Sequence, residues 1–364
     1  MSSATNTPTS DTPTSDTPTS NGPASNGPAA ADATTGPRIP GAAVAGARTT
    51  KVPWQAKYLM LSLIWGSSFL LMKVGLRTMA PLQISGLRIY AGTLTLLVLL
   101  VVTGGRLPRG RRTWGHLTVS GIFLTVLPFS LFALGEERVS SALAGIGNAT
   151  TPIAALFFAL LLLPSDRLSP RKLAAVLIGF LGVVVIIQPW ESAGRPDLLG
   201  FGMTLVAGAC YGLGWTYNRR HLGSADLGGL SMPTALLLVG SALMAPVLLV
   251  WWARHRDTYA APWSGHVDPA GGGWLVPLLC VLALGIVGTG LAYMLQFDVV
   301  RGAGATVSTT VTYLIPVVSV VLGVLVLGEH LAWPQLLGAA IVLVSAAVVG
   351  LPARRRKDEV GPAS

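Results

Sequence analysis

Two basic side chains lie inside apolar stretches, Lys73 in "LIWGSSFLLMKVGL" and Arg88 in "PLQISGLRIYAGTLTLLVLL". If these stretches are helices joined by a turn near residues 79–81, a rise of about 1.5 Å per residue brings both cations to similar depths. Two cations in a dry environment repel each other and need water or an anion between them. We expect the pair to bind an anionic group of a ligand, such as a carboxylate, with Glu136 or Glu137 as the candidate counter-ion within the chain. The structural alternative for Lys73 is a side chain that extends to the nearest polar boundary.

Polar residues also gather before two prolines, in "GNATTP" and in "ATVSTTVTYLIP". A proline inside a helix removes a backbone hydrogen bond, which leaves a carbonyl group available to a cavity or to a moving helix. The alternative is that Ser and Thr bond their own backbone and that small residues permit close packing. Both interpretations stay open. The first predicts a binding cavity lined by Asn148, Thr151, Thr309 and Tyr313, with Pro152 and Pro316 as gating residues.

Large side chains elsewhere could line the same cavity. Aromatic residues are more often core or interface residues than ligand contacts, so packing is the alternative for each of them. The candidates for ligand contact are Trp65, Tyr211, Trp215 and Tyr293, together with Gln296.

The composition is that of a membrane protein. Of the 364 residues, 51% are hydrophobic and only 11% are charged, and the mean hydropathy is +0.62, far above the range of water-soluble domains. The net charge of +10 comes from short basic clusters between apolar runs. Because no basic face with interleaved aromatic residues is formed, we expect no nucleic-acid partner.

The residues that several other functions need are missing. No GxxxxGK[ST] motif for nucleotide binding occurs. The five histidines fall at expected helix ends or in loops, and no Asp or Glu lies deep within an expected span, as an intramembrane enzyme or a proton relay would require. We therefore expect no enzyme, no cofactor and no metal site. The cysteines, Cys210 and Cys280, lie in separate apolar runs and indicate no disulfide framework.

The two ends of the chain differ from the rest. Residues 1–50 contain a drifting Thr/Pro/Ser repeat, "TPTSDTPTSDTPTS", with too little apolar surface to offset the entropy of ordering. We expect a disordered cytoplasmic tail there, and a short basic cytoplasmic tail at residues 352–364.

Ten apolar runs between these tails are long enough to cross a bilayer, which takes about 20 helical residues. We therefore predict an all-α polytopic membrane protein with ten transmembrane helices. The expected spans are Tyr58 to Gly75, Leu82 to Thr103, His116 to Leu134, Ser141 to Leu163, Lys172 to Gln188, Leu199 to Asn218, Leu230 to Trp252, Trp274 to Gln296, Gly304 to Leu327 and Trp333 to Leu351.

The two halves of the chain resemble each other. A shift of 164 residues places Pro152 on Pro316, a shift of 146 places "WG" at residue 65 on "YG" at residue 211, and a shift of 148 places Gly92 on Gly240. Five helices per copy is an odd number, so the second copy enters the membrane from the opposite side. We predict two inverted five-helix repeats, residues 54–190 and 198–351, an arrangement found in many secondary transporters.

Residues 54–350 resemble the EamA-type transporters of the drug/metabolite transporter superfamily. The resemblance rests on "LIWGSSFLLMKVGL", on "PLQISGLRIYAGTLTLLVLL" with its Arg88, and on "LGEHLAWPQLLGAAIVLVSAAVV". It implies ten helices in two repeats that move small metabolites, amino acids or drugs, with export favoured. The first repeat departs from the pattern, since Pro164-Ser165 stands where the second has Gly328-Glu329.

These features predict a secondary transporter of the cytoplasmic membrane that moves a small polar or amphipathic metabolite by alternating access. The expected partners are this small-molecule substrate and the lipid bilayer, and a homodimer stays an open alternative. A membrane receptor or scaffold that transports nothing is the rival function. It would predict a folded soluble module at one end of the chain, whereas one tail has low complexity and the other is short.

The positions of Lys and Arg predict the orientation. With the N-terminus inside, 18 of the 25 basic residues fall on the inner side and five on the outer side, as the preference of basic loops for the cytoplasm requires. Both termini are therefore expected in the cytoplasm. A reporter enzyme that is active only outside the cytoplasm, fused after Lys357, should give no signal, and a bright signal would contradict both the topology and the inverted repeats.

Overall fold

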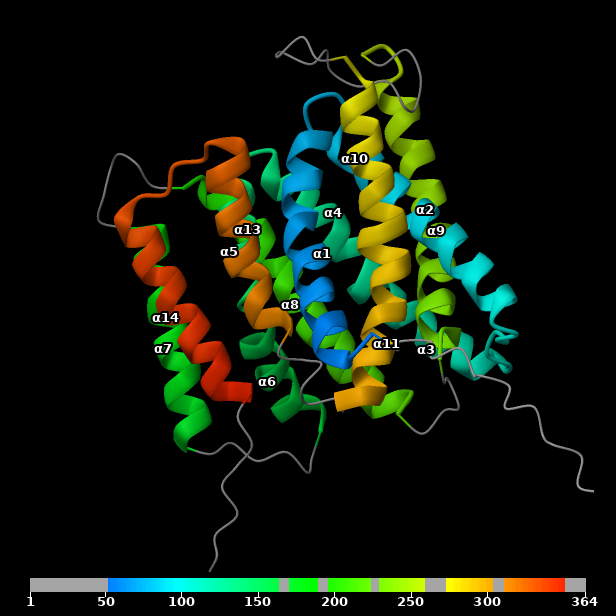
Figure 1. Cartoon of the computed structure of the whole chain (residues 1–364), viewed down its shortest axis with the longest axis horizontal. Coiled ribbons are helices and arrows are strands. Elements are labelled where there is room, and N and C mark those ends of the chain that lie inside the picture. The colour runs from blue at the N-terminus through cyan, green and yellow to red at the C-terminus, as the bar shows by residue number, and fades with distance from the viewer. Residues whose placement is uncertain are drawn as a thin grey trace, which may run out of the picture. The chain divides into compact units, whose positions relative to one another are not determined.

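The computed structural model (Figure 1) describes residues 52–163, 170–188, 196–223, 229–258, 273–303 and 311–350. Within these ranges the chain forms helices and turns and contains no β-strand. The predicted all-α class is confirmed for this part of the chain.

The described part of the first half contains seven α-helices, two of which are joined by a π-helical turn. They are α1 (Trp54–Gly75), α2 (Pro81–Val102), α3 (Arg111–Gly121), the π-helical turn η1 (Ile122–Val126), α4 (Leu127–Glu136), α5 (Ser141–Asn148), α6 (Thr151–Leu162) and α7 (Pro170–Ile187). The second half contains α8 (Leu198–His221), α9 (Ser231–His255), α10 (Leu275–Gly285), the π-helical turn η2 (Ile286–Leu291), α11 (Ala292–Ala303), α13 (Val311–Leu327) and α14 (Trp333–Gly350).

Seven helical segments of the described chain are long and apolar enough to cross a membrane. They are Trp54–Gly75, Pro81–Val102, Arg111–Glu136, Ser141–Leu162, Leu198–His221, Ser231–His255 and Leu275–Gln296. Three shorter apolar helices, Leu173–Ile187, Val311–Leu327 and Trp333–Ser345, fall where three more spans were predicted. Ten crossings would need all ten segments, so the number ten stays a prediction.

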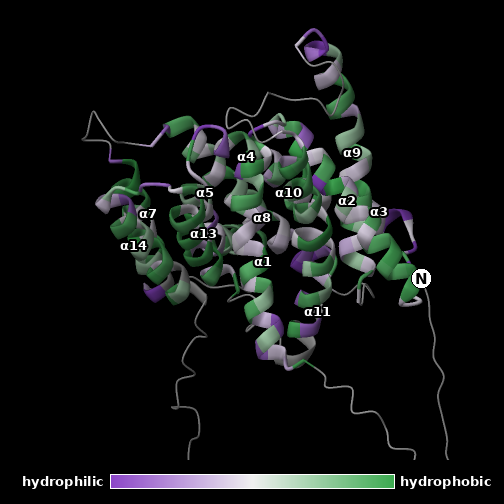
Figure 2. Ribbon diagram, turned by 45° about the horizontal axis from the view of Figure 1, so that its top comes forward, coloured by the Kyte–Doolittle hydropathy of each residue, from purple (hydrophilic) through white to green (hydrophobic). Residues whose placement is uncertain are grey.

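The outer faces of these helices are apolar. Figure 2 shows hydrophobic residues along most of the helical ribbon and hydrophilic residues mainly near the helix ends. Large apolar side chains such as Leu94, Phe180 and Leu325 are more than 60% exposed. An apolar surface of this extent is expected where the solvent is lipid.

The local sequence explains where several helices begin. In α2 and α14 a proline stands in the first turn, where its missing N–H removes no helical hydrogen bond. The backbone N–H before each helix donates to a glutamine in the first turn, Ala80 to Gln83 at 2.9 Å and Ala332 to Gln335 at 3.0 Å. At α8 the Asp197 carboxylate accepts from the N–H of Gly200 at 2.6 Å.

Close helix contacts occur as matched pairs in the two halves. A Cβ atom added to Gly66 of α1 would lie 2.4 Å from the Cβ of Val318 in α13, and one added to Gly212 of α8 would lie 2.9 Å from the Cβ of Ala154 in α6. The two glycines are 146 residues apart and their neighbours 164, the same shifts that align the sequence with itself.

A second matched pair involves the π-helical turns. A Cβ atom on Gly92 of α2 would lie 3.1 Å from the Cβ of Thr289 in η2, and one on Gly240 of α9 would lie 3.3 Å from the Cβ of Thr125 in η1. The offsets are 148 and 164 residues. The internal similarity of the sequence therefore coincides with matched contacts in the structure.

We predict that Gly212→Ala destabilises the protein, because the new methyl group would lie 2.6 Å from the backbone nitrogen of Ala155 and overpacking typically costs about 1–3 kcal/mol. Gly202→Ala, in the same helix, is the matched control, because no atom of the described residues lies within 4 Å of its added Cβ atom and alanine favours helix by up to about 1 kcal/mol. Melting temperatures of the purified variants in detergent should fall for the first and not for the second. Equal melting temperatures would contradict the close contact between α6 and α8.

Candidate functional site

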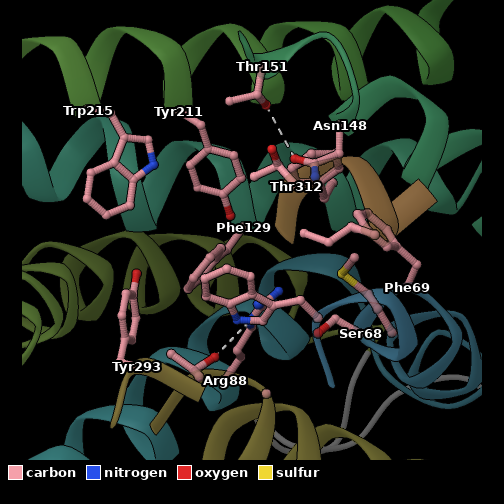
Figure 3. A pocket seen from close by; sticks show the side chains of 16 residues that line it. Ser68, Phe69, Arg88, Phe129, Asn148, Thr151, Tyr211, Trp215, Tyr293 and Thr312 are labelled. Atoms are coloured by element: carbon pink, nitrogen blue, oxygen red, sulfur yellow. Dashed lines mark hydrogen bonds between the residues drawn. The ribbon is translucent and has the colours of Figure 1, made fainter. Parts of the chain in front are cut away.

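A cavity of about 110 Å³ lies among the helices of the bundle. It is smaller than the ~300–1,000 Å³ of typical drug-sized sites, so in this conformation it would hold only a small molecule. The described residues that line it are Trp65, Ser68, Phe69, Met72, Arg88, Phe129, Phe132, Asn148, Thr151, Tyr211, Trp215, Gly288, Thr289, Tyr293, Thr312 and Ile315. They come from both halves of the chain (Figure 3).

Aromatic rings form much of the cavity wall. The Phe69 and Phe132 rings meet edge to face with centroids 5.4 Å apart, and the Tyr211 ring lies 6.0 Å from that of Phe132. Aromatic contacts of this kind fix the position of each ring. Figure 3 shows Trp215 and Tyr293 on the same side of the cavity view. The wall is therefore a rigid apolar surface that fits a flat or branched apolar group.

Arg88 is the one charged side chain among the described lining residues. It is only 8% exposed. Its Nε donates to the Thr289 hydroxyl at 3.1 Å, and its guanidinium carbon lies 3.9 Å from the centre of the Phe129 ring. Within the described chain no hydrogen bond occupies its two terminal nitrogens, and a guanidinium group with free N–H groups is well suited to bind a carboxylate.

A polar patch from α5, α6 and α13 also lines the cavity. Asn148 ends α5 and Thr151 begins α6, so the interruption between the two helices brings both side chains to the cavity. The Thr151 hydroxyl donates to the Asn148 amide oxygen at 3.4 Å, and Figure 3 shows Thr312 beside this pair. These groups can both donate and accept hydrogen bonds, which suits an ammonium, hydroxyl or amide group of a ligand.

Lys73 does not line the cavity. Its ammonium group donates to the backbone carbonyls of Glu136, at 2.5 Å, and Val139, at 2.8 Å. The lysine therefore fastens α1 to the last turn of α4. The structure does not bring Lys73 to the cavity beside Arg88, and a shared anion site of the two residues stays a prediction.

Glu329 fastens the other side of the same region. Its carboxylate accepts from the N–H of Ser141 at 2.7 Å, from the Ser141 hydroxyl at 3.0 Å and from the N–H of Ala142 at 3.0 Å, and so caps the N-terminus of α5. Gly328 adopts a left-handed conformation with φ of 65° after the end of α13, which turns the chain toward α5. The corresponding Pro164-Ser165 of the first half lies outside the described residues.

Glu136 is the buried one of the two acids that follow the third predicted span. It ends α4 and is 0% exposed. Neither of its carboxylate oxygens has a hydrogen-bond partner within the described chain. The sequence places Glu136 beside the exposed Glu137 at the end of an apolar run, and only the packing of α4 decides which of the two is buried.

The remaining predicted residues have different places. Gln296 in α11 and Tyr313 in α13 are not among the residues that line the cavity, although Thr312 is. Pro152 stands in the first turn of α6, where the helix starts anew, whereas Pro316 lies inside the continuous α13. Thr309 lies outside the described residues.

Several residues that line the cavity were not predicted from the sequence. On α1, Ser68, Phe69 and Met72 follow Trp65 at intervals of three, four and seven residues, the spacing of one helix face. Extending the candidate set along that face would have found them. By contrast, Gly288 and Thr289 reach the cavity through the π-helical turn η2, and no simple periodicity predicts such a turn.

Comparison with known proteins identifies the fold family. The model of the EamA-like transporter family matches residues 54–188 and again residues 198–351. The chain belongs to the EamA-like transporter family. The resemblance noted in the sequence is confirmed, and this EamA-like transporter is a multi-pass membrane protein.

Relatives of this EamA-like transporter bear transporter names. The "Uncharacterized inner membrane transporter YedA" of Escherichia coli is 24% identical over 80% of this chain and 88% of that protein. The "Probable amino-acid metabolite efflux pump" of Salmonella typhimurium is 25% identical over 78% of this chain and 90% of that protein. A crystal structure with 20% identity shares the fold, with a TM-score of 0.54 over 81% of this chain and 95% of that one.

We predict that Lys73→Met lowers the melting temperature of this EamA-like transporter. The change removes hydrogen bonds from a charged donor to two carbonyls, and such bonds contribute about 1.5–3 kcal/mol each. Arg77→Met is the matched control, because Arg77 is an exposed cation four residues away. If both variants melt at the temperature of the native protein, Lys73 does not fasten α4.

Proposed function

We propose that this chain is a secondary transporter with ten spans in two inverted five-helix repeats, which moves an amino-acid-like or similarly amphipathic metabolite with an anionic group, outward, across the cytoplasmic membrane. The single observation that carries the substrate class is Arg88, a buried guanidinium group in the wall of a cavity whose other described lining residues are uncharged. An apolar wall with one buried cation complements a small molecule that has both an apolar part and a carboxylate.

Several observations support the inverted repeats. The family model matches the chain twice, with bounds close to the proposed repeats at residues 54–190 and 198–351. The contacts of Gly66 and Gly92 recur at Gly212 and Gly240. An odd number of spans in each copy requires opposite orientations, and a site between such copies can be exposed to either side in turn.

Contacts at the two ends of α1 support alternating access. At one end Lys57 forms an ion pair with Asp298 of α11, with the Nζ and Oδ2 atoms 2.5 Å apart. At the other end Lys73 binds carbonyls at the end of α4. The two lysines are 16 residues apart in the sequence, or about 24 Å along a helix. Because only a few polar contacts join the helices at each end, breaking those at one end can open that end of the cavity while the rest of the bundle stays packed.

The orientation and direction complete the proposal. The excess of basic residues on one side supports cytoplasmic N- and C-termini, which puts Lys57 at the inner end and Lys73 at the outer end. The relatives named as amino-acid metabolite efflux pumps support export. They also favour transport over a receptor or scaffold.

The test compares metabolites inside and outside cells that overproduce the chain or lack it, with Arg88→Met, Arg88→Lys and Arg112→Met variants at matched membrane abundance. We expect overproduction of the native chain to raise the external concentration of one or more amino-acid-like anions. Arg88→Met should lower that export by about tenfold or more, since a bond to a charged group contributes about 1.5–3 kcal/mol, and Arg88→Lys should restore part of it.

Arg112→Met is the control, because it removes an exposed cation from α3. Native export in both Arg88→Met and Arg112→Met cells would contradict the role of Arg88. No difference in external metabolites between overproducing and deleted cells would contradict export itself.

A further inference from the structure

A buried carboxylate without a hydrogen-bond partner among the described residues lies outside the cavity. Glu136 is 0% exposed and neither carboxylate oxygen has a hydrogen-bond partner within the described chain. An ionised carboxylate in such surroundings loses its hydration and gains no donor in return, which costs far more than taking up a proton. In this conformation the burial of Glu136 without a hydrogen-bond donor therefore favours its neutral form.

The charged groups around Glu136 come from three other elements. Lys73 of α1 and Arg88 of α2 act on it as cations, and Glu329, between α13 and α14, acts as an anion. From α8 the titratable Tyr211 packs with its ring 6.0 Å from that of Phe132 in α4. The described α5 contributes no titratable residue. None of these charged groups forms an ion pair within 4.0 Å of the Glu136 carboxylate in the described chain.

Two polar contacts at the proposed outer end lie beside Glu136. Lys73 binds the backbone carbonyl of Glu136 itself and that of Val139. Glu329 caps α5 directly after the same turn. Separation of α1 and the α13–α14 turn from the ends of α4 and α5 would break these contacts next to Glu136, and we take this movement as the one that lets water reach its side chain.

We propose that Glu136 is a proton-binding site of the transport cycle, which takes up one proton when the outer end of the cavity closes and releases it to water when that end opens. This inference rests on the proposed alternating access and orientation. The step is a simple proton transfer: the carboxylate accepts a proton from outer water on closing, and the carboxylic acid returns it on opening.

The sign of the pH dependence follows from linkage. The closed state binds one proton more than the open state, so low external pH favours the closed outer end and high external pH favours the open one. One proton changes the ratio of the two states by up to about tenfold per pH unit.

Arg88 connects this equilibrium to the cavity, because an anion bound to Arg88 would offset the attraction of its charge for an ionised Glu136. Binding of an anionic substrate and closing of the outer end should therefore favour each other.

The experiment measures how fast a thiol in the cavity reacts with a membrane-impermeant thiol reagent from outside. Ser68→Cys places the thiol in the cavity wall, in a full-length chain whose Cys210 and Cys280 are replaced by alanine. Labelling is measured on intact cells between pH 6 and pH 8.5. Arg77→Cys, at an exposed position near the outer end, corrects for the pH dependence of thiol reactivity itself.

We expect the corrected rate to rise with pH in the chain that keeps Glu136, by several-fold and up to about tenfold per unit. In Glu136→Gln, whose amide resembles the neutral acid, the rate should stay at the low value seen in acid. Glu137→Gln is the matched control, because Glu137 is the exposed neighbour, and it should behave as the native chain. Glu136→Asp keeps a carboxylate, so its corrected labelling rate should still depend on pH, with a displaced midpoint. This variant also tests the proposal if the Glu136→Gln protein fails to fold.

Two results would overturn the proposal. One is a corrected rate that does not depend on pH in the chain with Glu136, and the other is an unchanged dependence in Glu136→Gln. Both leave alternating access standing as long as the Ser68→Cys thiol still reacts with the reagent from outside. If that thiol does not react from outside at any pH, the opening of the cavity to the outside is contradicted and the proton site with it.

Discussion

The lack of water in the bilayer interior is the constraint on which the structure depends, because every polar group there must find its partner within the protein. Most hydroxyl groups meet this demand locally: Ser62, Thr93 and Thr234 each donate to the carbonyl four residues earlier. Asn218 and Trp252 each leave one buried nitrogen without a partner in the described chain. The buried charged side chains of the described chain are Arg88, whose partners are one hydroxyl and one aromatic ring, and Glu136, which has no hydrogen-bond partner. In the two places that hold these charges, a ligand or a proton can supply what the protein does not.

Close helix packing surrounds these two places. Without a hydrophobic driving force between helices in lipid, association depends on contact between backbones, and small residues permit it. Gly66, Gly92, Gly212 and Gly240 all lie at such contacts, at matching positions of the two halves. The π-helical turns η1 and η2 stand 164 residues apart as well, and one of them carries the Thr289 that orients Arg88. The packing that joins the halves thus also shapes the cavity.

The sequence predicts this framework well and the details of the site only in part. Apolar runs, and the offsets at which the chain aligns with itself, are properties of long segments. They are recognised correctly even when each helix end is wrong by a few residues. Trp65, Arg88, Asn148 and Tyr211 line the cavity. They could be selected from the sequence because each is an unusual residue type in an apolar helix. Lys73 was the same kind of exception, but its partners are backbone carbonyls, and a sequence does not reveal which carbonyls a helix end leaves available. Whether Glu136 or Glu137 is buried depends on how α4 is rotated about its axis, because successive helix residues are separated by about 100°. This difference amounts to one residue, which is less than the error of a predicted helix boundary.

The four charges around the end of α4 are best understood as one set. Lys73, Arg88, Glu136 and Glu329 would sum to zero if all were ionised, yet only Lys73 and Glu329 have hydrogen-bond partners that account for their charge, namely carbonyls and helix N–H groups. Arg88 has a neutral hydroxyl partner and an aromatic ring, and Glu136 has none within the described chain. The unbalanced members are therefore one cation that faces the cavity and one acid that lies behind it. A substrate anion at Arg88 and a proton on Glu136 would compensate both at once, so the charge balance of this region gives a physical reason for the two binding events to be linked.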